Sequence, residues 1–167
     1  MSDTWALDNF LYNNTLGTPA VDMMYVVSTR VSSLVINVES PYSPSTSKSS
    51  GTSALTATSL ELNEYGPAVS WTGSYVTDVA CIAKACTNDF NFFVASGSSQ
   101  AQLFGFGILG LGPVSKGDPT VSLVKALKEA DQVSEPVVTI WLNDIYSNQK
   151  DINRSYTGIV TFGGHGN

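Results

Sequence analysis

The sequence is poor in charged side chains, which make up 13% of its 167 residues, about half the share of an average soluble domain. Its eight Lys and Arg residues form no cluster, so the basic stripe of a nucleic-acid-binding surface is missing. No apolar run approaches the roughly 18 residues of a membrane-spanning helix. The sequence therefore indicates neither a nucleic-acid partner nor a membrane span.

Residues that bind metals are also scarce. The chain has two Cys and one His, too few for the usual zinc ligand sets, so we expect no metal and no cofactor. Cys81 and Cys86 flank four residues. They form either a local disulfide across a hairpin or two buried thiols, because spacing alone does not give the Cα distance that a bridge needs. The first residues, MSDTW, lack the basic start and apolar stretch of a signal peptide.

Ser, Thr, Gly and Asn are abundant, which favours an all-β domain with many turns. Alternating apolar and polar residues predict a series of strands in one domain, residues 1–167, and VVTIWL among them is apolar enough to be buried. The Ser/Thr-rich stretch 39–59 predicts a long surface loop or very short edge strands. The predicted strands are 22–27, 33–38, 60–65, 73–83, 90–95, 137–142 and 158–164.

Two segments depart from this alternation. In 104–113, FGFGILGLGP, glycine alternates with bulky apolar residues, which is typical of backbone passing tightly through a core. Residues 119–130 begin with Pro and predict a helix. Its apolar side would be formed by Val121, Leu123, Val124 and Leu127.

Several short motifs follow one another in an order that identifies a family. The strongest is Gly107–Gly112, GILGLG. The others are Leu16-Gly17-Thr18-Pro19, Ser32 with Leu34 and Ile36, Tyr42-Ser43-Pro44, Tyr65-Gly66, Thr72-Gly73, Asp78-Val79, Val138–Leu142 and Phe162-Gly163-Gly164. Together they resemble the N-terminal lobe of pepsin-like aspartic proteases. The resemblance implies an all-β fold, a single pepsin-like lobe of the double-psi β-barrel type with one or two short helices.

The same resemblance places the family's catalytic Asp-Thr-Gly turn on Ser28-Thr29-Arg30. The family hydrolyses peptides with two carboxylates that share a proton. Here Ser28 replaces the aspartate, and a serine hydroxyl is not a base near neutral pH without a partner. Neither nearby carboxylate fills the gap, because Asp22 lies on the preceding strand and Asp78 resembles a structural residue of the family.

Other family positions are also changed. Phe106 stands where the family has the aspartate before Gly-Ile-Leu-Gly, and His165 is read as a tail residue rather than a catalytic partner. Tyr65 matches the family's flap tyrosine, whose usual tryptophan partner falls at Val35. Tyr65, Gly66 and Trp71 are thus candidate ligand-binding residues. Trp71 either grips a ligand or packs within its strand, and packing is favoured.

The resemblance therefore implies a catalytically inactive aspartic protease homologue that binds a peptide or a protein. One alternative is an endopeptidase that works only when paired with a lobe carrying a catalytic Asp. The other is a truncated product without a function of its own. An unpaired lobe exposes strand edges, so we expect a partner lobe or a homodimer that meets around Thr29, Arg30 and Gly107–Gly112, although two Arg30 charges would oppose pairing.

Location and modification follow from the same resemblance. The family is mostly secreted or lysosomal, which implies an extracellular or lysosomal protein, while the lack of a signal peptide in this sequence leaves the cytoplasm open. Asn13 and Asn153 begin Asn-x-Ser/Thr triplets and are candidate glycosylation acceptors in a secreted protein.

Overall fold

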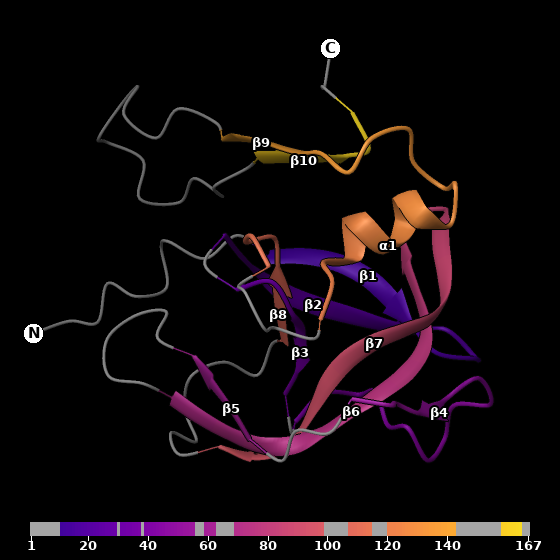
Figure 1. Ribbon diagram of the computed structural model, residues 1–167, viewed down its shortest axis with the longest axis vertical. Helices are drawn as coiled ribbons and strands as arrows, with labels where there is room; N and C mark the ends of the chain where they lie inside the picture. Colours follow the sequence, from indigo (N-terminus) through magenta and orange to yellow (C-terminus); the bar gives the residue numbers. More distant parts are fainter. Residues whose placement is uncertain are drawn as a thin grey trace, which may run out of the picture.

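The computed structural model describes residues 11–29, 31–37, 39–55, 59–62, 69–98, 107–114, 120–142 and 158–164. Strands dominate these residues and one short helix accompanies them (Figure 1), which confirms the predicted all-β class. The strands are β1 (Leu11–Leu16), β2 (Val21–Ser28), β3 (Leu34–Ile36), β4 (Gly51–Thr52), β5 (Ser59–Leu62), β6 (Val69–Ile82), β7 (Ala85–Ser98), β8 (Gly107–Gly110), β9 (Val138–Leu142) and β10 (Gly158–Phe162), and the helix is α1 (Leu123–Glu129).

The larger sheet closes on itself as a barrel. Its strands follow the order β1-β2-β8-β3-β7-β6-β4, and β5 pairs with β6 beside this path. The ring closes where Thr15 and Leu16 of β1 pair with Cys81 and Ala80 of β6. Two of the pairs, β2 with β8 and β3 with β7, are parallel, whereas β3 and β8 are antiparallel. Strands from distant parts of the sequence are thus interleaved, and β8 lies between β2 and β3.

The glycines of β8 are what allow it to fit there. A Cβ atom on Gly107 would lie 2.6 Å from the carbonyl oxygen of Val35, and one on Gly110 would lie 2.4 Å from that of Ser33. Such contacts are far shorter than van der Waals distance, so only glycine permits the backbones to approach this closely. The predicted tight passage of this segment through a core is therefore confirmed.

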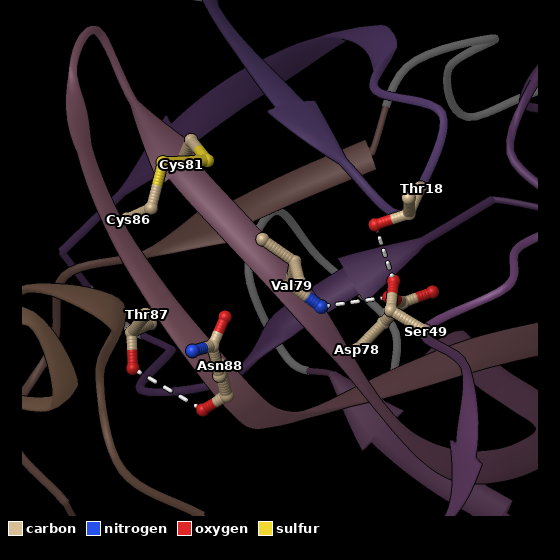
Figure 2. The surroundings of a disulfide bond; sticks show 8 residues. All are labelled: Thr18, Ser49, Asp78, Val79, Cys81, Cys86, Thr87 and Asn88. Atoms are coloured by element: carbon tan, nitrogen blue, oxygen red, sulfur yellow. Dashed lines mark hydrogen bonds between the residues drawn. A yellow bond between two sulfur atoms is a disulfide. The ribbon is translucent and has the colours of Figure 1, made fainter.

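Strands β6 and β7 form a hairpin of two 14-residue strands joined by Ala83 and Lys84. Cys81 and Cys86 are directly opposite each other next to this turn, and they form a disulfide with a Cα–Cα distance of 4.1 Å (Figure 2). The structure thus contains the bridge that was one of two alternatives from the sequence. Strand β6 begins earlier and β7 runs longer than the alternation predicted.

Helix α1 is shorter than the predicted segment 119–130. The chain is still extended at Ser122, and the helix begins only at Leu123. Thr120 is buried and its hydroxyl bonds to a serine of the barrel, which holds this approach in a non-helical path. The helix buries Leu123, Val124, Ala126 and Leu127. Leu123, Ala126 and Leu127 belong to the main hydrophobic core, together with Tyr25 and Phe92 of the barrel.

Strands β9 and β10 form a separate two-stranded ribbon next to α1 (Figure 1). Ile140 and Phe162 on one face pack against the main core. Trp141 and Ile159, which are paired across the ribbon, point the other way and are 55% and 60% exposed. The sequence predicted a buried strand here, and this was wrong for Trp141, because a two-stranded ribbon covers only one of its faces.

None of the helical segments among the described residues is long and apolar enough to cross a bilayer.

Candidate functional site

The turn that follows β2 is the candidate site. Ser28, its last strand residue, is buried and pairs with Gly110 of β8. Thr29 follows and is exposed to solvent. Arg30 lies outside the described residues. The structure therefore places Ser28 at the end of a central barrel strand, directly before the exposed Thr29.

The turn is held in shape by main-chain hydrogen bonds from the end of β8. These bonds involve only amide and carbonyl groups, so they do not require particular side chains at positions 28 and 29. They run from the amide of Gly110 to the carbonyl of Ser33 (3.1 Å), from Leu111 to Ser28 (2.7 Å) and from Gly112 to Val31 (2.8 Å). These three bonds join the end of β8 to the described residues on both sides of the turn.

A buried group of hydroxyls ties this turn to the segment before α1. The hydroxyl of Thr120 lies 2.7 Å from that of Ser33 and 3.5 Å from that of Ser32. All three residues are buried. Since a buried polar group is costly unless it is hydrogen-bonded, this contact fixes the distance between the turn and the start of the helix.

A groove of about 460 Å³ opens between these two elements and the β9–β10 ribbon. Most of its lining residues are apolar, but polar atoms make up nearly half of its exposed surface; the lining contains two hydroxyls and one ammonium, and no carboxylate among the described residues. Among the described residues of the turn, Thr29 lines it. The other lining residues are Leu111, Gly112, Pro113, Val114, Ser122, Val124, Lys125, Pro136, Val138 and Ile140. Such a surface can hold an apolar side chain, but it offers no acid–base pair.

The carboxylates considered from the sequence lie elsewhere. Asp22 is exposed near the start of β2, opposite Thr15. Asp78 is fully buried in β6 and accepts hydrogen bonds from the Tyr42 hydroxyl (2.6 Å), from the Ser49 hydroxyl and from the Val79 amide (2.7 Å). Figure 2 shows the bond from the Val79 amide to Asp78 and the bond between Ser49 and Thr18. Both oxygens of this carboxylate are therefore engaged in holding the Ser/Thr-rich loop to the barrel.

The pKa of Asp78 reflects this network. Burial by itself raises the pKa, but the hydrogen bonds, that of Ser49 first and that of Tyr42 second, outweigh it and lower the pKa below 3.8. Burial and the contact with Asp78 raise the pKa of Tyr42. Asp78 thus stays ionised and its partner stays protonated near neutral pH, which is the behaviour of a structural pair rather than of a general acid or base.

Strands β5 and β6 pair in the region where the sequence suggested a flap, with Leu60 opposite Trp71 and Leu62 opposite Val69. Tyr65 and Gly66 lie outside the described residues. Trp71 is only 4% exposed and belongs to a second core cluster with Val35 and Phe93. Trp71 therefore packs within the protein, as the favoured interpretation of the sequence had it, and does not project into solvent.

The remaining candidates are placed as follows. Asn13 lies within β1, paired with Met24 of β2, and Asn153, Phe106 and His165 lie outside the described residues. The described part of the chain contains no group of three or more His, Cys, Asp or Glu residues that could hold a metal ion.

The homodimer surface expected around Gly107–Gly112 needs a correction. Residues 107–110 are buried within the sheet between β2 and β3, so they are not free to contact a second chain. The exposed residues of this region are Thr29, Pro113 and Val114. Sequence reasoning missed the groove that they border, because four separate segments build it and Thr29 is far in the sequence from the other three.

Comparisons with known proteins agree with one another. The sequence model of the family described as "Eukaryotic aspartyl protease" matches residues 15–167. A probable aspartic-type endopeptidase opsB of Aspergillus oryzae is 30% identical over 186 aligned positions, and the opsB of Aspergillus fumigatus is 26% identical over 185. Each alignment covers 95% of this chain and 35% of the relative. The crystal structure of an aspartic proteinase from Irpex lacteus superposes with a TM-score of 0.73 at 18% identity, covering 95% of this chain and 45% of that one.

Proposed function

Because the chain belongs to the eukaryotic aspartyl protease family, we propose that this lobe is a catalytically inactive member that binds a peptide or protein segment in the groove beside Thr29. The observation that carries the proposal is the residue at the end of β2. Ser28 stands there, where the family resemblance calls for a carboxylate, and the described lining of the adjoining groove contains no Asp or Glu.

The chemistry of the family supports the inactive assignment. Two close carboxylates share one proton because both cannot ionise together, and one then acts as base while the other acts as acid. A buried serine hydroxyl cannot take the place of either group, since it needs a partner base to lose its proton. Asp78 cannot substitute because its two oxygens already accept hydrogen bonds within the barrel.

The groove itself supports ligand binding. Its volume of about 460 Å³ lies within the range of roughly 300–1,000 Å³ that is usual for small-ligand sites. Val124, Val138 and Ile140 give it apolar walls, while Thr29 and Ser122 supply hydroxyls. Apolar walls with a few polar groups are typical of peptide side-chain pockets, in which apolar burial gives affinity and polar contacts set orientation.

One observation favours a second function. Main-chain bonds tie the described residues on both sides of the turn to the end of β8, and the chain spans 35% of the length of each curated relative. A partner lobe that carries a catalytic Asp could therefore face this turn. In that case the pair would act as an endopeptidase, with this lobe contributing the scaffold and the other lobe the carboxylate.

A cleavage assay separates the two functions. The purified lobe is expected to leave denatured haemoglobin intact from about pH 2 to pH 7, with or without pepstatin, because it lacks the carboxylate pair. Changing Ser28→Asp together with Arg30→Gly rebuilds the family triplet but should restore little activity in a single lobe. Pepstatin-sensitive cleavage by the homogeneous wild-type lobe would refute the inactive assignment. Activity of the variant that rises with the square of its concentration would show that two lobes pair.

A matched pair of surface variants tests the groove. Peptides are selected from a random display library on the immobilised wild-type lobe and are then measured against Val114→Arg and Met24→Arg. Val114 and Met24 are 43% and 39% exposed, so both changes should leave the fold intact, but only Val114 lines the groove. We expect loss of binding in Val114→Arg alone. A library that yields no binder, or equal loss in both variants, contradicts the proposal.

A further inference from the structure

Two polar side chains are buried inside the barrel without a hydrogen-bond partner. Asn14 of β1 is 4% exposed, and Tyr25 of β2 is fully buried. The amide nitrogen and the amide oxygen of Asn14 form no hydrogen bond to any residue that the structure describes, and neither does the hydroxyl of Tyr25. A buried polar group without a partner costs free energy, and native proteins contain few of them. These three atoms therefore call for a partner from outside the chain.

The pairing of β1 with β2 brings the two side chains to the same side of the sheet. Asn14 lies opposite Met23, and Tyr25 is the next residue of β2 that faces the same way, because side chains alternate along a strand. Met23 and Tyr25 belong to the main core, so this side is the interior of the barrel. The ring of Tyr25 also lies against β8, since a Cβ atom on Gly107 would come within 2.8 Å of it. Asn14 and Tyr25 are thus diagonal neighbours in a closely packed interior.

Contacts within the protein do not satisfy this pair. Burial first and the nearby Tyr42 second raise the pKa of Tyr25, whereas the Asn14 side chain lowers it. Asn14 thus lies close to the hydroxyl, although the two groups do not have the geometry of a direct hydrogen bond. Tyr42 is not available as a donor, because its hydroxyl hydrogen is already directed at Asp78. The Tyr25 hydroxyl keeps its proton and can therefore both donate and accept.

We propose that ordered water occupies an internal site between the side-chain amide of Asn14 and the hydroxyl of Tyr25. Water both donates and accepts, so it complements a hydroxyl and either end of an amide. A buried water usually makes about three hydrogen bonds to groups that are otherwise unsatisfied. About one or two molecules fit the three atoms, because the two ends of the Asn14 amide point in different directions.

The consequence of such a site is a water-mediated link between β1 and β2 inside the barrel. A bridging water is nearly as favourable as a direct hydrogen bond, so it would hold β1 against the strand that ends at Ser28. The inference is independent of ligand binding in the groove, because neither Asn14 nor Tyr25 is among the residues that line the groove.

Magnetic relaxation dispersion of oxygen-17 water, which counts long-lived internal waters, tests the proposal in solution. Asn14→Leu together with Tyr25→Phe replaces the polar pair by apolar side chains of similar size, which need no hydration. We expect this double variant to hold about one or two fewer long-lived waters than the wild type. Tyr75→Phe is the matched control. It removes a tyrosine hydroxyl from the second core cluster, away from Asn14, and should leave the number of waters unchanged.

A crystal structure of the wild type gives a second measurement that does not depend on the variants. Electron density for water should lie about 2.5–3.2 Å from the Tyr25 hydroxyl and from one end of the Asn14 amide. Equal numbers of long-lived waters in the wild type and the double variant would overturn the proposal, and so would an equal loss in Tyr75→Phe. A direct bond between Asn14 and Tyr25 in the crystal, without water, would also overturn it. If the double variant does not fold, the crystal structure alone decides.

Discussion

The buried carboxylate of Asp78 provides the sharpest test of how this fold is held together. Asp78→Asn keeps the shape of the side chain and one carbonyl oxygen, which can still accept from Ser49 and the Val79 amide. The new amide group replaces the oxygen that accepts from Tyr42 at 2.6 Å. A hydrogen bond to a charged group contributes about 1.5–3 kcal/mol and a neutral one about 0.5–1.5 kcal/mol.

If the new amide donates to the Tyr42 oxygen, three charged hydrogen bonds become neutral ones, which removes about 3 kcal/mol. Because the variant no longer buries a charge, part of this is regained, and we expect a net loss of about 2 kcal/mol at pH 7. The loss must depend on pH. Because the folded pKa of Asp78 lies below 3.8, its carboxylate stabilises the fold fully above pH 4 or so, and this stabilisation disappears as the pH falls through the lowered pKa.

Urea unfolding at pH 7 and at pH 2 measures the effect. The variant should unfold at a lower urea concentration than the wild type at pH 7, and the difference between the two should be smaller at pH 2. Asp22→Asn is the matched control, since Asp22 is an exposed carboxylate on β2 and should change stability by less than about 0.5 kcal/mol. An Asp78→Asn variant as stable as the wild type at pH 7, or a deficit that persists undiminished at pH 2, would refute the role assigned to the charge.

Two further substitutions test other parts of the framework. Changing Cys81 and Cys86 together to Ser should lower the free energy of unfolding by about 2 kcal/mol, the chain-entropy value for so short a loop. A reducing agent should destabilise the wild type but not the variant. Equal responses of the two proteins to the reductant would argue against the bridge. Gly110→Ala should lower the free energy of unfolding by about 3 kcal/mol or more, because its Cβ would lie 2.4 Å from a backbone oxygen of the turn. The backbone cannot move away from this contact without disturbing the sheet. Circular dichroism melts of both variants check these values, and a Gly110→Ala variant that melts with the wild type would contradict the packing of β8.

Much of the fold could be predicted from local patterns. The alternation in β2 and the glycine spacing of Gly107–Gly112 reflect packing in the immediate neighbourhood, and the motif order identified the family. The pattern could not give the bounds of helix α1, because its start depends on the bond between Thr120 and Ser33, which are far apart in the sequence. It also could not show that Trp141 is exposed, because exposure depends on how many layers cover the β9–β10 ribbon.

The candidate site was also predictable only in part from the sequence. The sequence assigned Ser28 and Thr29 to the turn only by their spacing from Ser32 and Leu34 in the family resemblance. The groove was not predicted, since Val114, Lys125 and Ile140 meet only through the tertiary fold. For Trp71 the sequence left two interpretations, and the deciding quantity was its burial in the cluster with Val35.

The interleaving of β8 between β2 and β3 has a consequence for the order of folding. The β6–β7 hairpin joins neighbours across a two-residue turn and can form within microseconds or so. The contacts of β8 with β2 close a long loop, whose entropy must be overcome before those contacts contribute. We therefore expect β8 to insert late, so that the turn at Ser28 takes its final shape only after the rest of the barrel has formed. A newly made chain would then form the groove last, and a destabilised chain would lose it first while the β6–β7 hairpin persists.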